Sequence, residues 1–282
     1  MKVLITGASG MLGRDLQAAL SDREVTALGR ADLDVTDASA AREAVDGHDV
    51  VINAAAYTKV DDAETHEDEA YAVNAIGAAN LSIAAAAAQA RLVQVSTDYV
   101  FDGSATSPYP ENGPHAPISA YGRTKAAGER LALEANPGAT FVVRTAWLYG
   151  AHGPNFAKTM LKLAETKDTW SVVDDQVGQP TWTGDLARQI VALLDTDAPA
   201  GIYHGTNRGQ VSWFGFARAV LEEAGLDPDR ITPTDSSAFV RPAPRPAYSV
   251  LGHDAWFRAG LAPMRDWREA LTAATEAGVF TA

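Results

Sequence analysis

Residues 2–20 read KVLITGASGMLGRDLQAAL. The aliphatic run before the first glycine predicts a buried strand, and the apolar spacing after the last one predicts a helix. Gly7, Gly10 and Gly13 lie between them, at the spacing G-x-x-G-x-x-G. Such glycines permit a tight turn and close approach of the backbone to a pyrophosphate, which the helix N-terminus attracts. This order predicts a dinucleotide site, although a glycine-rich loop alone can be an ordinary turn.

Strand and helix patterns alternate through the first part of the chain. Strands are expected at residues 3–6, 25–28, 50–53, 92–96 and 141–144, and helices at residues 12–20, 38–45, 69–90, 121–134 and 155–166. Strands separated by helix-length segments need crossover connections, which produce a parallel sheet covered by helices on both faces. The predicted fold class is therefore α/β, a Rossmann-like doubly wound parallel sheet.

The composition changes beyond about residue 170, toward Pro, Asp and Thr. Helices are expected at residues 186–194 and 214–224, and the segment RPAPRP at residues 241–246 predicts an ordered loop, because proline cannot continue a helix or a central strand. We expect residues 1–170 to form the dinucleotide-binding domain. Residues 171–282 should form a smaller, predominantly substrate-binding α/β lobe, with some later segments packing back onto the first domain.

Composition and charge exclude several classes of protein. The 282 residues are 46% hydrophobic and 21% charged, as in an ordinary globular chain, and they contain no cysteine, which excludes disulfides and thiolate chemistry. The net charge of −13 argues against nucleic acid and anionic membranes as partners, so an anionic ligand must meet local positive groups. The longest apolar stretch, residues 81–88, is too short to span a bilayer, and we expect a cytoplasmic protein.

The end of the second expected strand bears on the choice of dinucleotide. NAD-binding folds place an acidic residue there, which accepts from the ribose 2′-hydroxyl, whereas this chain has Gly29 and Arg30. A guanidinium can pair with a 2′-phosphate, so NADPH is the expected cofactor. The alternative is NADH, with an exposed Arg30 and a carboxylate from Asp32 or Asp34.

A tyrosine and a lysine four residues apart, Tyr121 and Lys125, share one face of an expected helix. A neighbouring ammonium stabilises a phenolate and should lower the pKa of Tyr121 toward a range useful in proton transfer. Most pairs at this spacing have no such role. Here, however, the glycine loop lies upstream and Thr97 ends the strand between them, which is the order of a hydride-transfer site.

That order resembles the extended short-chain dehydrogenase/reductase superfamily, over nearly the whole chain. Five stretches look more closely like the dTDP-4-dehydrorhamnose reductase family: NAAAYT at residues 53–58, STDYVFDG at 96–103, RTAWLYG at 144–150, NFAKTM at 155–160 and DDQVGQPT at 174–181. The resemblance implies a reduced nicotinamide cofactor and a dTDP-sugar substrate. The implied reaction reduces the C4 ketone of dTDP-4-dehydro-L-rhamnose to dTDP-L-rhamnose.

The resemblance also implies roles for individual residues. Tyr121 is the proton donor to the C4 oxygen, Lys125 holds the nicotinamide ribose, and Thr97 hydrogen-bonds the carbonyl. Asp98 and Trp147 belong to the substrate site, although Trp147 could instead be a core residue. The cofactor residues it implies are Gly7, Gly10, Met11, Leu12, Gly13, Arg30, Asp34, Val35, Ala54, Ala55, Ala56, Tyr57, Thr58, Tyr121 and Lys125.

The nucleotide diphosphate needs cations, and Arg241 and Arg245 in the proline-rich segment are the candidates; the alternative is that both are solvent-exposed. The six histidines show no metal-ligand spacing. Some members of the resembled family hold Mg²⁺ at a dimer interface, for which Asp15 could serve, and the sequence leaves that metal open. The resemblance allows a monomer or a homodimer.

One residue separates this chain from the related nucleotide-sugar dehydratases, in which a glutamate follows the segment that resembles Ser96-Thr97-Asp98. Here Tyr99 takes that place, and a phenol without its own lysine cannot readily abstract a proton at neutral pH. Two alternatives to the rhamnose reductase stay open. One is a ketoreductase that gives a C4 epimer, and the other is a catalytically silent NADP-binding regulatory subunit.

Overall fold

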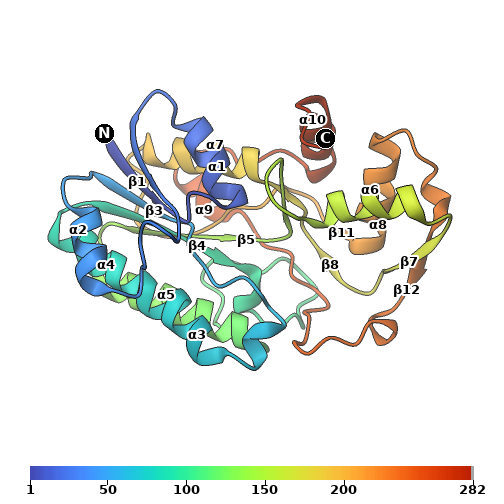
Figure 1. Cartoon of the computed structure of the whole chain (residues 1–282), viewed down its shortest axis with the longest axis horizontal. Helices are drawn as coiled ribbons and strands as arrows, with labels where there is room; N and C mark the ends of the chain where they lie inside the picture. Colours follow the sequence, from blue (N-terminus) through green and yellow to red (C-terminus); the bar gives the residue numbers. More distant parts are fainter. Residues whose placement is uncertain (281–282) are drawn as a thin grey trace.

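A computed structural model describes residues 1–280 of the chain, and its centre is a six-stranded sheet (Figure 1). All neighbouring strands in this sheet are parallel. Their order across the sheet is β2 (Glu24–Leu28), β1 (Lys2–Thr6), β3 (Val50–Asn53), β4 (Arg91–Thr97), β5 (Thr140–Thr145) and β10 (Gly201–His204). The doubly wound α/β fold expected from the sequence is confirmed.

Helices cover both faces of this sheet, as the alternation along β1 requires. Val3 and Ile5 pack in a core with α1 (Met11–Ala19), α7 (Thr183–Leu194) and α9 (Asp254–Arg258). Leu4 faces the opposite way, into a core with α2 (Ala38–Val45) and α4 (Gly77–Ala87), and α5 (Ala120–Ala135) packs on α4. Figure 1 shows the two helical layers above and below the sheet.

A second core lies beside the sheet and is rich in aromatic residues (Figure 1, right). It is built from α6 (Phe156–Thr166), α8 (Trp213–Glu223), α10 (Trp267–Glu276) and the parallel pair β7 (Trp170–Val173) and β12 (Ile231–Thr234). Two shorter strand pairings complete this region: β6 (Leu148–Tyr149) with β9 (Thr181–Trp182), and β8 (Val177–Gly178) with β11 (Val211–Ser212). Sequence patterns predicted α6, α7 and α8, but none of β6 to β12, whose strands are too short to show a period.

The carboxyl ends of the strands are fixed to one another by buried polar side chains. The Thr6 hydroxyl donates to Asn53 Oδ1 at 2.6 Å, and Asn53 Nδ2 donates to Gln94 Oε1 at 2.8 Å. These residues lie on β1, β3 and β4. The chain passes from β1 to β2 on one side of β1 and then crosses to β3 on the other side, so the strand order reverses between β1 and β3. Ligands of open α/β sheets bind at such a switch point.

The helix expected at residues 69–90 begins two residues earlier, ends three residues earlier and is less regular than its pattern indicated. It begins with α3 (Glu67–Tyr71), widens into one π-helical stretch (η2, Ala72–Ile76) and continues as α4. The whole run, Glu67–Ala87, is long and apolar enough to cross a membrane by length and composition alone, which the apolar stretch at residues 81–88 did not indicate. Half of its apolar window is buried inside the protein, as expected of a core helix.

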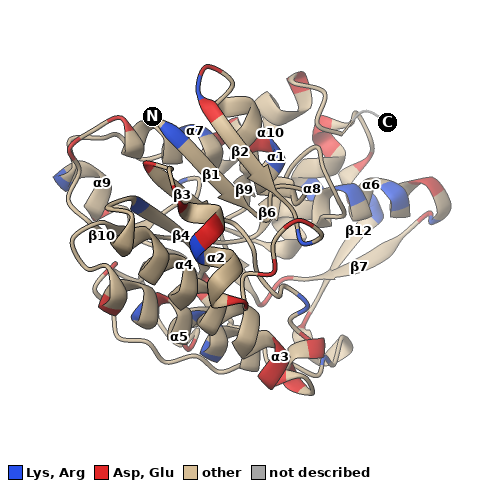
Figure 2. Ribbon diagram, turned by 60° about the vertical axis from the view of Figure 1, so that its left-hand side comes forward, with Lys and Arg blue, Asp and Glu red and all other residues tan. Residues whose placement is uncertain are grey.

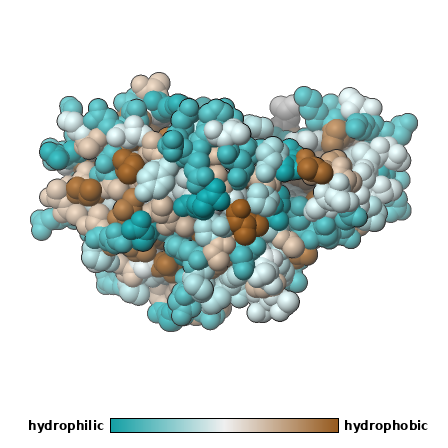
Figure 3. Space-filling view, turned by 90° about the horizontal axis from the view of Figure 1, so that it is seen from below, coloured by the Kyte–Doolittle hydropathy of each residue, from teal (hydrophilic) through white to brown (hydrophobic). Residues whose placement is uncertain are grey.

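Surface charge and hydropathy are mixed. Figure 2 shows acidic residues gathered on α3, where Glu67, Asp68 and Glu69 form the first turn. Large apolar side chains that reach the surface are scattered singly among hydrophilic ones on the face in Figure 3. Single exposed apolar residues of this kind are ordinary on a folded protein.

Candidate active site

The glycine loop joins β1 to α1 at the switch point of the sheet. Gly7 has a φ of +68°, and a Cβ there would lie 2.6 Å from the backbone of Ala54 and Ala55. A Cβ on Gly13 would lie 2.4 Å from the Gly7 carbonyl oxygen. Within residues 1–280, no side chain caps α1, whose N-cap is Gly10. The first N–H groups of α1 are therefore available to an anion.

The carboxylates after β2 already have partners in the backbone. Asp32 accepts from the Gly29 N–H at 2.8 Å, and Asp34 accepts from the Thr36 N–H at 3.0 Å and from its hydroxyl at 2.7 Å. The hydrogen bonds from Thr36 lower the pKa of Asp34, with a smaller contribution from the Arg30 charge. Arg30 itself is exposed. Its guanidinium is the positive group at this end of the sheet.

The loop after β3 is anchored by a side chain from the π-helical stretch. Asn74 Oδ1 accepts from the Tyr57 N–H at 2.8 Å, and Asn74 Nδ2 donates to the Tyr57 carbonyl at 3.2 Å. The Tyr57 hydroxyl donates to Asp62, and this hydrogen bond raises the pKa of Tyr57 to about 12. Residues 54–58 are thereby held along the edge of the crevice.

One cavity of about 1480 Å³ runs from the glycine loop to α5. It brings together all the expected cofactor residues and most of the expected substrate residues. Its lining includes Gly7, Gly10, Met11, Leu12, Gly13, Arg30, Asp34, Val35, Ala54, Ala55, Ala56, Tyr57, Thr58, Thr97, Asp98, Tyr121, Lys125 and Trp147. The lining leaves out Arg241 and Arg245, which border a second cavity of about 630 Å³ beside the aromatic core.

Tyr121 and Lys125 lie in the first turns of α5, whose N-cap Ser119 accepts from the Gly122 N–H at 3.1 Å. The Lys125 ammonium donates to the Val95 carbonyl on β4 at 2.7 Å. Burial lowers the pKa of Lys125 to about 8, against the charge of Glu129 one turn along, which raises it. The lysine is therefore fixed beside the cavity and still mainly charged at neutral pH.

The sequence-based expectation for the Tyr121 pKa is wrong for the protein without ligands. Burial of the hydroxyl raises the pKa of Tyr121 to about 12, the Thr97 hydroxyl lowers it, and the Asp98 charge raises it. The Lys125 ammonium does not lower it, because it is held on the Val95 carbonyl. Tyr121 is thus a neutral phenol, with a proton to donate.

Thr97 and Asp98 lie at the end of β4, where the η3 turn (Asp98–Val100) begins. The Thr97 hydroxyl donates to Asp98 Oδ1 at 2.9 Å and accepts from the Tyr99 N–H at 3.3 Å. Only 2% of Asp98 is exposed, and burial raises the pKa of Asp98 to about 6, against hydrogen bonding from Ser249 and Thr97. This carboxyl group changes its charge close to neutral pH.

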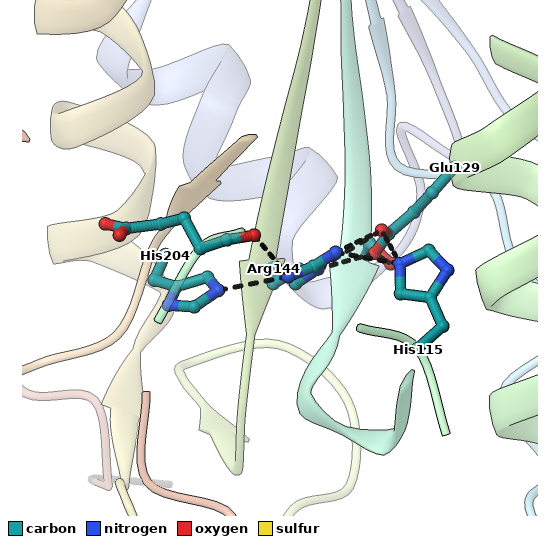
Figure 4. A network of polar contacts seen from close by, with 6 residues as sticks. His115, Glu129, Arg144 and His204 are labelled. Carbon is teal, nitrogen blue, oxygen red and sulfur yellow. Dashed lines mark hydrogen bonds and ion pairs between the residues drawn. The ribbon is translucent and has the colours of Figure 1, made fainter. Parts of the chain in front are cut away.

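A buried ion pair holds α5 against the sheet, one turn along the helix from Lys125 (Figure 4). Arg144 on β5 donates to Glu129 through Nη2 at 2.7 Å and through Nε at 2.9 Å, and both side chains are fully buried. Ser96 and His115 also contact Glu129, and Arg144 contacts His204 Nε2 at 3.3 Å. Burial alone would raise the pKa of Glu129, but its hydrogen bonds to His115 and Arg144 outweigh burial and hold it at about 2.

Trp147 is held in a fixed orientation at the cavity wall. Its backbone has a φ of +47°, which is rare for a residue other than glycine. Its ring stacks on Trp213 at 3.5 Å between centroids and 8° between planes. A Cβ on Gly178 would lie 2.5 Å from the same ring. A constrained aromatic face of this kind at a cavity suits binding of a sugar ring.

Arg245 and Arg241 both pair with one carboxylate from the other side of the crevice. Arg245 lies 3.0 Å from Asp61 and Arg241 lies 3.5 Å from it. The Ala243 N–H also donates to Asp61 at 3.3 Å, so Asp61 ties the proline-rich segment to the loop after β3. Arg245 further lies 6.0 Å from the centre of the Tyr99 ring, which faces the first cavity.

Comparison with known proteins identifies the family. A family model described as the RmlD substrate binding domain matches residues 1–279. The chain belongs to the RmlD substrate binding domain family. A dTDP-4-dehydrorhamnose reductase of Streptomyces griseus is 53% identical over 95% of this chain and 91% of its own length. A dTDP-4-keto-6-deoxy-D-glucose reductase of Streptomyces niveus is 49% identical over 96% of this chain and 95% of its own length.

A solved structure extends this comparison to the cofactor. The dTDP-4-dehydrorhamnose reductase of Bacillus anthracis, crystallised in complex with NADP, has a TM-score of 0.94 and 40% identity, and the match covers 98% of this chain and all of that one. The RmlD-family chain described here fits such a group. A Cβ on Gly7 or Gly13 would collide with the backbone around the loop, so the loop leaves room only for glycine there. The N-terminus of α1 has no side-chain cap within the described residues, and Arg30 lines the same cavity, where a guanidinium can pair with a 2′-phosphate.

Sequence reasoning missed several residues of the RmlD-family site. Arg14 lines the first cavity, and Asp61 and Asn74 anchor the segments around it. Arg14 follows the glycine loop directly, so its position could have been predicted, whereas Asp61 and Asn74 meet the site only through tertiary contacts. Tyr99, which the sequence marked only by contrast with the dehydratases, also lines this cavity. Among residues 1–280, no group of three or more His, Cys, Asp or Glu side chains that could hold a metal ion occurs.

Proposed function

We propose that this RmlD-family protein catalyses the NADPH-dependent reduction of the C4 ketone of dTDP-4-dehydro-L-rhamnose to dTDP-L-rhamnose. The observation that carries this proposal is one cavity that holds a glycine-rich pyrophosphate cradle together with Tyr121, Lys125 and Thr97. The relatives' names supply the substrate class, and the NADP complex of the Bacillus anthracis relative supports the cofactor.

The cofactor positions follow from the lining of the first cavity. The α1 N–H groups at Met11 and Leu12 would take the pyrophosphate, and Val35 with Asp34 would flank the adenine. Arg30 would pair with the 2′-phosphate, and Arg14 adds a second guanidinium on the same wall. Asp32 is occupied by the Gly29 N–H, which favours NADPH over NADH.

Proton donation to the substrate falls to Tyr121. Bound NADPH supplies the hydride in this reaction. The buried phenol keeps its proton at neutral pH and can give it to the C4 oxygen as negative charge develops there. Lys125 remains mainly a cation on the Val95 carbonyl, where it would hold the nicotinamide ribose of the bound cofactor. Tyr99 is buried, which raises its pKa and makes it a poor base for a dehydratase reaction.

The dTDP-sugar would extend from the first cavity into the second. The Trp147 ring would contact the sugar, and Arg245 with Arg241 would bind the diphosphate in exchange for Asp61. The substrate lobe would then be the aromatic region around α6, α8 and α10. The helices α8 and α10 lie within residues 171–282, and α6 belongs to the end of the part before residue 170. Residues 183–204 carry α7 and β10, which complete the dinucleotide-binding layer.

Incubation with NADPH and dTDP-4-dehydro-L-rhamnose tests the proposal. We expect loss of absorbance at the nicotinamide wavelength and a rhamnose product by NMR. A talose-type product would instead identify the reductase that gives the C4 epimer. Cofactor binding without any oxidation would contradict both reductases and indicate the silent subunit.

A further inference from the structure

Asp98 is a buried carboxyl group whose chemistry the reaction above does not use. It lines the first cavity, it is 2% exposed, and it follows Thr97 directly. Its Oδ1 accepts from the Thr97 hydroxyl at 2.9 Å. Its other oxygen, Oδ2, is buried and has no hydrogen bond within 3.5 Å in the described part of the chain. An ionised carboxylate in such a place is costly, whereas a protonated one is not.

The protonation of Asp98 decides which way the neighbouring hydroxyl points. Thr97 has one hydroxyl proton, and with Asp98 ionised that proton is given to Oδ1. Thr97 then has only lone pairs left for Tyr121 or for a substrate carbonyl. When Asp98 is protonated it can donate to Thr97 instead, which frees the Thr97 proton for the Tyr121 oxygen. The neutral acid is therefore the state that can pass a proton toward the reacting group.

We propose that Asp98 is a proton-relay residue that reprotonates Tyr121 through the Thr97 hydroxyl, an inference that rests on the proposed reductase function. After Tyr121 has given its proton to the C4 oxygen, the O–H bond of Thr97 breaks and a new O–H bond forms on the phenolate. Thr97 regains a proton as the O–H bond of Asp98 breaks. Asp98 is left as a carboxylate and takes a proton from solvent, so one solvent proton enters for each alcohol formed.

The surroundings of Asp98 suit a group that cycles between its acid and its anion. Tyr99 on its own turn and Tyr121 on α5 are neutral phenols, so neither pins the carboxylate. Arg245 lies on the far side of the Tyr99 ring and is paired with Asp61, which neutralises most of its charge. It therefore stabilises an ionised Asp98 only weakly. The Ser249 hydroxyl and the backbone N–H groups of Asp98 and Tyr99 favour the ionised form, and burial outweighs them.

Infrared spectroscopy tests the relay without substrate. In the wild-type protein with NADP⁺ we expect a carboxylic C=O band that disappears as pH rises, with a midpoint at about pH 6. Asp98→Asn should remove this band, and Thr97→Val should move its midpoint upward because the carboxylate loses a donor. A wild-type protein with no such band, or a midpoint that Thr97→Val leaves unmoved, would overturn the inference.

The pH profile of kcat tests whether the relay serves turnover. We expect wild-type kcat to fall about tenfold per pH unit above the midpoint of Asp98, and this limb to vanish in Asp98→Asn, with kcat about 100-fold lower at acidic pH and KM little changed. Asp102→Asn, the same change at a partly exposed carboxylate four residues along, should keep the wild-type profile. A variant Asp98→Asn that raises KM but retains the limb would make Asp98 a substrate clamp only.

These two measurements separate the inference from the function on which it rests. If wild-type protein fails to oxidise NADPH with the dTDP-4-ketosugar, the proposed reductase is wrong, whatever the infrared band shows. If wild-type protein turns over while the band is absent, the reductase stands and the relay is wrong. Thermal unfolding and NADP⁺ binding of Asp98→Asn confirm that the variant is folded before either result is read.

Discussion

Glu129→Gln is the most informative single change outside the cavity, because it removes one charge and almost no volume. The wild-type carboxylate accepts two hydrogen bonds from Arg144, at 2.7 and 2.9 Å, and both side chains are fully buried. The side-chain NH₂ of the variant would face groups that donate to the wild-type carboxylate, which include Ser96 and His115. Two donors would then face each other without an acceptor between them. Arg144 would remain a buried cation without a counter-charge.

Removing one partner of a buried ion pair destabilises a protein by roughly 3–5 kcal/mol. The entropy of unfolding is about 2.1 cal/mol/K per residue, or about 0.6 kcal/mol/K for a chain of this length. The melting temperature should therefore fall by about 5–8 °C. Loss of the Glu129 charge should also lower the pKa of Lys125 below its value of about 8, because that charge raises it.

Scanning calorimetry and the pH profile of turnover measure these two effects. Glu134→Gln is the matched control, since Glu134 lies on the same helix in an exposed pair with Arg130, and it should change stability by less than about 0.5 kcal/mol. Loss of the Lys125 charge should give a second fall in kcat at higher pH than the Asp98 limb, and this second limb should move to lower pH in Glu129→Gln alone. An unchanged melting temperature in that variant would refute the argument from the buried pair.

Four further predictions follow from the same geometry. Tyr121→Phe should retain NADPH binding and lose turnover by about 10²-fold or more, as stopped-flow oxidation would record; near-normal rates would remove Tyr121 from the mechanism. Arg30→Ala should weaken NADPH binding about 10- to 100-fold and leave NADH binding unchanged, measured by fluorescence titration; equal losses would refute a contact with the 2′-phosphate. Arg245→Ala should raise KM for the dTDP-sugar about tenfold at constant kcat, and an unchanged KM would exclude it from the diphosphate site. Burial lowers the pKa of His204 to about 3 and that of His253 to about 4, so the stability they contribute is present above about pH 6.5 and lost as pH falls. Each should contribute a loss of about 1.4 kcal/mol at pH 5.5, and His253→Gln should remove its share of the acid-induced shift in melting temperature.

Much of the fold was predictable because the first part of the chain carries strong local patterns. The β1 strand, the glycine loop and α1 were expected from residues 2–20, and the structure has them at Lys2–Thr6 and Met11–Ala19. The last strand of the sheet, β10, was missed, since its residues GIYH lack the aliphatic run that marks the equally short β3, VVIN. It joins the sheet only because α7 returns the chain to the edge of β5.

The candidate site was predictable to the extent that its residues belong to continuous motifs. Thr97, Tyr121 and Lys125 were expected together, and all three line one cavity. Their ionisation was not predictable, because it depends on burial and on partners from other elements. The Val95 carbonyl that holds Lys125 is one such partner. Asp61, which neutralises Arg245, is a second such partner, and no local sequence pattern marks it.

The sequence by itself determined the order of strand, glycine loop and helix, because those features depend on interactions between residues close along the chain. It also determined which side chains could carry proton chemistry, in a chain that has no cysteine to compete with a phenol, an ammonium and a carboxyl group. Only the tertiary structure decided their charges. Desolvation and pairing act through space, so a neutral Tyr121, an Asp98 whose pKa is raised to about 6 and a neutralised Arg245 arise from packing between distant segments.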